Sequence, residues 1–158
     1  MGAAEAQGAA GDLQGMVSVR VGGQTFGVPV LKVQDVITQT GINVVPLAPP
    51  EVAGSLNLRG RIVTAIDLRS RLGVPARGAG ERFMCVIVER GGELYALLVD
   101  DVGDVLWLPA SAFEAAPVTL SPAWRDLCDG LYRLERELLL ALKVESVLAL
   151  DATSSRAA

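Results

Sequence analysis

The densest group of side chains that could support chemistry is the acidic trio Asp100, Asp101 and Asp104. Carboxylates gathered in this way can hold a hard cation through their oxygens, and a bound cation can assist hydrolysis. The trio lacks the alternating Asp positions and closing Glu of a calcium loop, so we interpret it as a solvated strand end. We predict no metal site. We also predict no cofactor, because no glycine-rich phosphate-binding loop is present.

Histidine is absent from all 158 residues. Its absence excludes Ser-His-Asp and Cys-His catalysis and His-based zinc sites. An enzyme would have to use the acidic trio, and we predict that the protein is not an enzyme. The 14 Lys and Arg against 18 Asp and Glu leave a formal net charge of -4. Nucleic acid is therefore not an expected partner, because its binding depends on cationic side chains.

Cys85 and Cys128 stand in apolar or mixed surroundings, and we expect buried free thiols in a reducing compartment. Residues 1–15 contain no Lys or Arg and no apolar core of a signal peptide. No apolar run approaches the ~20 residues that span a bilayer. We therefore predict a cytoplasmic protein without direct membrane insertion.

Arg59 stands between two β-type segments and directly before Gly60. A tight bend at this point would place its guanidinium at the surface beside a neighbouring strand. Arginine can make a bidentate contact with a carboxylate, either within the fold or on a partner. Asp35 is a plausible mate, and an ordinary solvated arginine is the alternative.

Alternating apolar residues predict that these side chains are positioned by short strands. A first strand at Val17–Val21 turns at Gly22-Gly23 and returns through Val28, as in a hairpin. Periodicity leaves residues 30–37 open between helix and strand. Further strands are predicted at 44–45, 56–59 and 61–66, and a helix at 67–71 capped by Asp67 and ended by Gly73. Residues 1–15 and 151–158 are predicted to be flexible tails, which leaves 16–150 as the folded part.

The second half of the chain repeats the first. A shift of 69 residues places Val17 on Val86, Val33 on Val102 and Asp35 on Asp104, and a shift of 76 places Gly54 on Gly130 and Leu72 on Leu148. We interpret this as a duplication, with a first half at about 16–77 and a second at about 81–150. Two halves of roughly 65 residues, each too small to be comfortably stable alone, predict two small β-barrels that share an apolar interface.

Two related barrels side by side would form a groove lined by equivalent edges. Val33, Val36 and their repeat mates Val102 and Val105 would lie there, unless they are simply core residues. Small apolar residues with a charged rim are typical of a protein-binding surface.

Three segments carry a resemblance to a known family. In order they are FGVPVLKVQDV, VPLAPPEVAGSLNLRGRIVTAIDLRSRLG and VIVERGGELYALLVDDVGDVL. Their order resembles CheW, the adaptor that couples bacterial chemoreceptors to the histidine kinase CheA, over about residues 16–150. The resemblance implies an all-β fold of two SH3-like five-stranded β-barrels packed around a shared core, with short helices and no catalytic site.

The resemblance also implies which residues bind. The receptor-binding groove would be lined by Val30, Val33, Asp35, Met84 and Val102. The charged turn of Asn57, Arg59 and Gly60 would support it, with Asp35 as the salt-bridge partner of Arg59. The sequence departs from the family at Asp35, where Glu is frequent, at Thr64, where Pro is frequent, and at Ala96, where Gly is common. In residues 109–119, the segment that in the family can meet kinase domains in arrays, no clear motif is present.

The predicted function is a non-enzymatic scaffold that couples chemoreceptors to CheA and joins receptor arrays through protein contacts. Its partners would be the cytoplasmic tips of chemoreceptors and the regulatory domain of a CheA-type kinase. Two alternatives remain open at this point. One is the adaptor of a related chemosensory pathway, such as one controlling surface motility, and the other is a small-ligand-binding double barrel.

Overall fold

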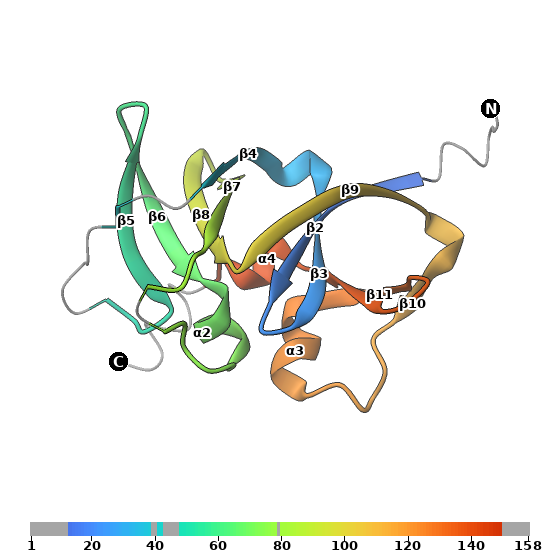
Figure 1. Cartoon of the computed structure of the whole chain (residues 1–158). Helices are drawn as coiled ribbons and strands as arrows, with labels where there is room; N and C mark the ends of the chain where they lie inside the picture. The colour runs from blue at the N-terminus through green and yellow to red at the C-terminus, as the bar shows by residue number, and fades with distance from the viewer. Residues whose placement is uncertain (1–12, 39–40, 43–47, 79, 150–158) are drawn as a thin grey trace.

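The computed structural model describes residues 13–38, 41–42, 48–78 and 80–149. The first half supplies β2 (Leu13–Val21), β3 (Gln24–Pro29), the 3-10 turn η1 (Val30–Lys32), β4 (Val33–Thr38), β5 (Val52–Leu58), β6 (Arg61–Asp67) and α2 (Leu68–Leu72). The second supplies β7 (Met84–Arg90), β8 (Glu93–Val99), β9 (Asp101–Pro109), η2 (Ala110–Ala112), β10 (Phe113–Ala115), α3 (Pro122–Leu127), β11 (Cys128–Arg133), β12 (Leu138–Leu142) and α4 (Val144–Val147). The expected all-β fold with short helices is confirmed (Figure 1).

Several predicted elements have the expected bounds, and two need correction. The helix α2 begins after Asp67, whose side chain accepts a hydrogen bond from the Arg69 amide, and it ends at Gly73 with a φ of 73°. Residues 30–37 combine both interpretations, as the turn η1 followed by the strand β4. The predicted tail ends too late, because β2 already begins at Leu13, where the backbone pairs with β9. The predicted strand at 44–45 and the tail at 151–158 lie outside the described residues.

The strands form two sheets that lie side by side. One has the order β10-β11-β12-β3-β2-β9, and the other has the order β4-β7-β8-β6-β5. Apart from β10, the two orders correspond strand by strand under the sequence repeat, since β2 matches β7, β3 matches β8 and β4 matches β9. The duplication inferred from the sequence therefore appears as a repeat of topology.

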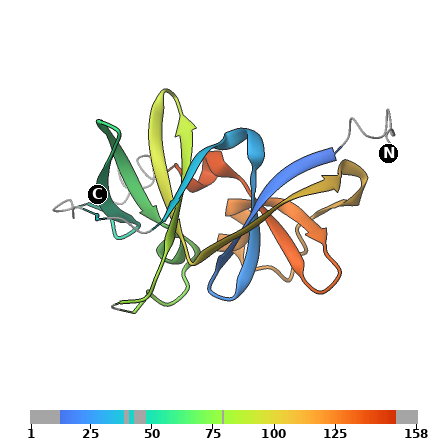
Figure 2. The ribbon, with the colours of Figure 1, turned by 45° about the horizontal axis from the view of Figure 1, so that its top comes forward.

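We expected each half of the chain to build its own barrel. The structure corrects this expectation, because each sheet contains strands from both halves. The hairpin β2–β3 joins β9, β11 and β12 of the second half, and the hairpin β7–β8 joins β4, β5 and β6 of the first. Each exchanged hairpin forms a parallel strand pair with the other half, β3 with β12 and β8 with β6. Figure 2 shows the crossings, as the light-blue β4 leaves the blue hairpin and the olive β9 runs the opposite way.

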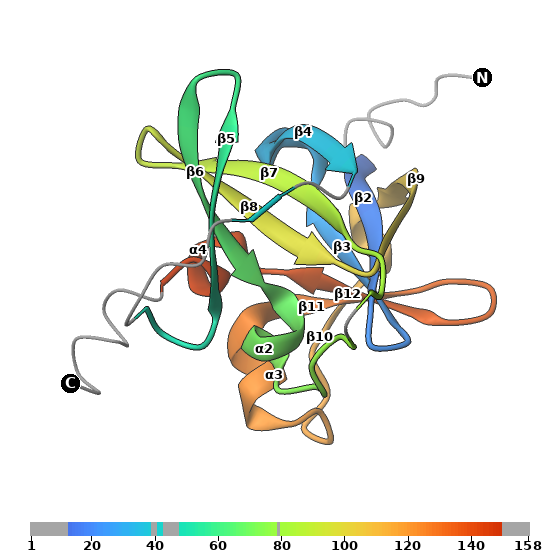
Figure 3. The same ribbon diagram turned by 60° about the vertical axis from the view of Figure 1, so that its left-hand side comes forward.

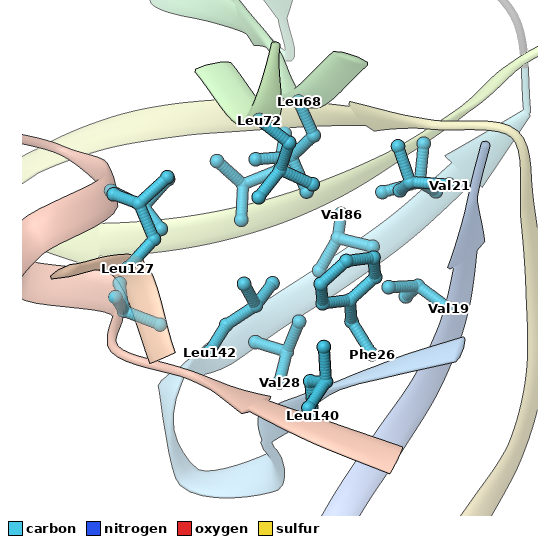
Figure 4. Packing of buried hydrophobic residues seen from close by; sticks show 14 of the residues in the cluster. Val19, Val21, Phe26, Val28, Leu68, Leu72, Val86, Leu127, Leu140 and Leu142 are labelled. Carbon is cyan, nitrogen blue, oxygen red and sulfur yellow. The ribbon is translucent and has the colours of Figure 1, made fainter. Parts of the chain in front are cut away.

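The buried apolar residues form three clusters. Two of them lie within the individual sheets, and repeat-equivalent residues such as Met16 and Cys85, or Tyr132 and Leu56, occupy corresponding places in them. The largest cluster is shared, and it surrounds Phe26 with side chains from both sheets and from α2 (Figure 4). Each fully buried Val or Leu contributes about 1.5–3 kcal/mol. Because both halves supply this cluster, neither can bury its apolar surface alone.

The short helices close one side of the shared core. Figure 3 shows α2 beside α3, with α4 above them on the left. The indole of Trp124 on α3 packs on the Phe26 ring with centroids 5.3 Å apart, and its Nε1 donates to the Leu72 carbonyl at 2.7 Å.

Candidate protein-binding site

Arg59 lies in a strained two-residue turn. Leu58 pairs with Arg61, so Arg59 and Gly60 alone connect β5 to β6, with φ values of 51° and 85°. The Asn57 side-chain oxygen accepts a hydrogen bond from the Gly60 amide at 2.9 Å and closes the turn. A side chain at such a φ costs about 1 kcal/mol or more, and persists because the surrounding structure holds it.

The other two hairpins of the same type use glycine where Arg59 stands. Gly22 in β2–β3 has a φ of 59° and Gly91 in β7–β8 has a φ of 61°, and each precedes a second glycine. Within the described residues, Arg59 is the one non-glycine with a positive φ. The chain therefore places an arginine where the backbone favours glycine, which points to a use for its side chain.

The predicted contact between Arg59 and Asp35 is confirmed. The Arg59 Nη2 donates to the Asp35 Oδ2 at 3.0 Å, and the other carboxylate oxygen accepts from the Val36 amide at 2.8 Å. A bulge in the β4–β7 ladder between Val33 and Asp35 sets the direction of this side chain. The Arg59 side chain remains 77% exposed, so most of the guanidinium can still meet a partner.

The pair borders a hollow of about 190 Å³. Its lining combines polar, charged and apolar side chains from β4, β5, β6, β7, β8 and the β5–β6 turn, namely Gln34, Asp35, Leu58, Arg59, Arg61, Ile87 and Leu94. Ile62, the next residue of β6, is 71% exposed. An apolar floor with a charged border is suited to a protein partner.

The predicted apolar groove residues share one environment. Val30, Val33, Met84 and Val102 are all half-buried and pack against the shared core. We call these four residues the apolar rim. Because each keeps part of its side chain accessible, the rim belongs to both the core and the surface.

Sequence reasoning missed how far the apolar surface extends. Trp107 is 60% exposed and Leu31 is 91% exposed. A Cβ atom added to Gly15 would lie 2.7 Å from both the Trp107 ring and a Val30 methyl, so these two side chains flank the same glycine. The sequence of β9 carried a sign of this surface, because its apolar residues occupy both faces of the strand. A strand with one face in water would alternate apolar and polar residues.

The acidic trio is not the solvated strand end that we predicted. Asp100 has a side chain only 20% exposed and it pairs with Arg69 and Arg77, whereas Asp101 and Asp104 are exposed. Burial alone would raise the pKa of Asp100, but hydrogen bonds from Arg69, the Gly22 amide and Arg77 lower it from 3.8 to about 2. Among the residues that the structure describes, no three His, Cys, Asp or Glu side chains are grouped to hold a metal ion.

Cys85 and Cys128 are free and buried, as expected. Burial raises the pKa of the Cys85 thiol to about 11 and that of Cys128 to about 12. The reactive thiolate is therefore scarce at neutral pH, and neither cysteine is an activated nucleophile.

Over the described residues, no helix combines the length and apolar character needed to cross a membrane.

Two β-sheets that exchange hairpins and share their largest apolar cluster define an all-β double-barrel protein. A family model, the CheW-like domain, matches residues 15–152. The chain belongs to the CheW family. Members of this family are chemotaxis adaptors, so the protein is a scaffold and not an enzyme.

Individual relatives and a solved structure agree with this assignment. The chemotaxis protein CheW of Rhizobium meliloti is 28% identical and covers 84% of this chain and 85% of its own. The chemotaxis protein CheW of Bacillus subtilis is 27% identical, with coverages of 89% and 90%, and the protein PilI of Pseudomonas aeruginosa is 25% identical, with coverages of 78% and 70%. The crystal structure of the scaffolding protein TtCheW from Thermoanaerobacter tengcongensis has the same fold. It superposes with a TM-score of 0.79 over 87% of this chain and 93% of its own, at 24% identity.

Proposed function

We propose that this protein couples the cytoplasmic tips of chemoreceptors to a CheA-type histidine kinase. The observation that carries the proposal is the strained Arg59, held beside Asp35 at the border of an apolar surface. The positive φ of Arg59 has a conformational cost, and the guanidinium is mostly exposed. A cost of this kind is expected where binding, rather than folding, needs the side chain.

The receptor would bind through the apolar rim and the charged pair together. Val30, Val33, Met84 and Val102 offer partly exposed aliphatic surface, and an amphipathic helix can lay its apolar face on such a surface. Asp35 and Arg59 at the border would set the register of the helix, because charge pairs contribute more to specificity than to raw affinity. The receptor-binding residues would then be the four rim residues and Asp35, with Asn57, Arg59 and Gly60 as the supporting turn.

The kinase would bind through its regulatory domain on a surface separate from the rim. A scaffold with two such surfaces raises the effective concentration of each partner for the other. A receptor conformation that binds differently to the complex then shifts the populations of active and inactive kinase. In this scheme the protein is cytoplasmic and reaches the receptor array through protein contacts.

The test is reconstitution of the protein with a CheA-type kinase and a receptor signalling fragment, with kinase autophosphorylation as the readout. Receptor-dependent control should appear only when the protein is present. Arg59→Glu should weaken receptor coupling while leaving the fold intact. Arg133→Glu is the matched control, because Arg133 of β11 is also exposed and pairs with Glu114 of β10 at 2.8 Å.

Three results would count against the proposal. They are the absence of any complex, control without the protein, and equal loss of coupling in both arginine variants. The identities to CheW proteins and to PilI are similar, so a second candidate is an adaptor of a related chemosensory pathway, such as one controlling surface motility. Running the assay with the kinase and receptors of each pathway distinguishes the two.

A further inference from the structure

Asp100 is the centre of a partly buried ion-pair network at one of the two places where the chain changes sheets. It stands between β8 and β9. Arg69 of α2 donates through Nε and Nη2 to both carboxylate oxygens at 2.9 and 2.8 Å. Arg77 donates to Oδ1 at 2.9 Å, and the Gly22 amide in the β2–β3 turn donates to Oδ2 at 2.8 Å. One carboxylate therefore joins a helix, a hairpin turn and the segment between the two halves.

The network is adjacent along the backbone to two residues of the apolar rim. Val102 is two residues after Asp100, and Met84 pairs with Val99, the residue before Asp100. The Arg77 guanidinium also lies over the ring of Phe83, 5.7 Å from its centroid, and Phe83 precedes Met84. The starts of β7 and β9, which carry Met84 and Val102, are both attached to the same charged cluster.

The other crossing is built differently. The repeat places Leu31 of η1 at the position of Asp100, and Leu31 is 91% exposed. Its neighbour Lys32 contacts Glu145 at 3.9 Å, with both side chains about half exposed. Such exposed pairs contribute little. The strand starts that carry Met84 and Val102 are therefore tied by charged hydrogen bonds, whereas the turn before Val33 has an exposed ion pair at the equivalent place.

Stability alone does not account for the network. A buried ion pair gains little over apolar packing, because removing its charges from water is costly. The cost is visible at Arg77, whose side chain is 8% exposed and whose Nε is buried without a hydrogen-bond partner among the described residues. What the network supplies beyond packing is directional geometry, with each strand start held at a defined position.

We propose that Asp100 is a positioning residue for the receptor-binding surface, and that it acts by fixing the strand starts that carry Met84 and Val102. The proposal rests on the function proposed above. A partner then binds rim residues whose positions are already ordered, which lowers the entropic cost of binding. Disrupting the network should weaken receptor binding more than the accompanying loss of stability would explain.

The test compares Asp100→Asn with Arg71→Met. Arg71 also lies on α2, and its side chain ties α2 to α4 by donating hydrogen bonds to the carbonyls of Val147 and Ser146 at 3.0 and 2.8 Å. Its replacement is therefore a matched structural defect outside the Asp100 network. Arg69→Lys is the milder variant of the network, because lysine keeps the charge but not the bidentate geometry. Receptor-fragment affinity is measured well below the lowest melting temperature, and methyl NMR of Met84 and Val102 is recorded without partner.

We expect Asp100→Asn to weaken receptor binding about tenfold and to shift both methyl signals, with a smaller effect of the same kind for Arg69→Lys. Arg71→Met should lower the melting temperature without either change. Equal losses of affinity in Asp100→Asn and Arg71→Met would overturn the proposal, and so would unchanged methyl signals in both network variants. If the unaltered protein binds no receptor fragment, the proposed function fails, while the methyl signals still decide whether Asp100 positions the rim.

Discussion

Replacing Arg59 by Asn should stabilise the protein and at the same time weaken its binding to receptors. The backbone at residue 59 has a φ of 51°, which asparagine tolerates better than arginine, and Asn-Gly is the preferred pair in this kind of hairpin turn. Relief of the strain is worth about 1 kcal/mol. Loss of the Asp35 contact costs about 0.5 kcal/mol, because the Arg59 side chain is 77% exposed. The net expectation is a gain of about 0.5 kcal/mol.

The gain is measured as the free energy of unfolding in urea, with an unchanged slope as the check that the unfolding transition is comparable. Asp35→Asn and the double variant complete a cycle, whose coupling energy should be about 0.5 kcal/mol for this exposed pair. Receptor-fragment affinity is measured on the same samples and should fall in Arg59→Asn, because the exposed guanidinium is gone.

A loss of more than about 1 kcal/mol in Arg59→Asn would refute this reasoning, since the guanidinium would then stabilise the fold beyond what an exposed pair can. Unchanged receptor affinity would refute the inferred use of the strained arginine.

Two further predictions concern titration. The Asp100 carboxylate contributes about 1 to 2 kcal/mol of stability, discounted for solvent screening, which is present above its unfolded pKa of 3.8 and is lost as the pH falls toward about 2. Urea midpoints taken across this range should fall more steeply in the unaltered protein than in Asp100→Asn, and parallel curves would contradict the assignment. The thiols of Cys85 and Cys128 should resist alkylation at pH about 8, where a pKa of about 11 or 12 leaves at most about one thiolate in a thousand. Both should react fully in urea, and rapid reaction of the folded protein would show that these thiols are accessible.

The local features of the fold were predictable because they depend on neighbouring residues. Paired glycines can adopt the positive φ of a tight hairpin, and Asp67 and Gly73 have the chemistry of helix caps, so the turns and α2 appear where expected. The contact between Asp35 and Arg59 was predicted from the complementary charges, although β4 and β5 are the two edge strands of their sheet and only the tertiary structure brings these side chains together. The rim residues Val33 and Val102 were found through the repeat.

The partial burial of Asp100 and its pairing with two arginines could not be predicted in the same way. Its neighbours Asp101 and Asp104 are exposed, and nothing in the local sequence distinguishes it from them. Arg69 and Arg77 reach it only because α2 and the segment after it fold against the β2–β3 turn. Trp107 was missed for a related reason, since its exposure depends on how far β9 extends beyond the shared core.

By itself the sequence determined that the chain is a duplicated all-β protein without histidine, because alternation, turn residues and repeated motifs are local properties. Only the tertiary structure decided how the two copies are joined. The hairpins β2–β3 and β7–β8 each complete the sheet of the other half, and strand pairing between distant segments leaves no local trace. The exchange buries one apolar core between both halves, and it places the charged turn, the rim and the Asp100 network on a common framework.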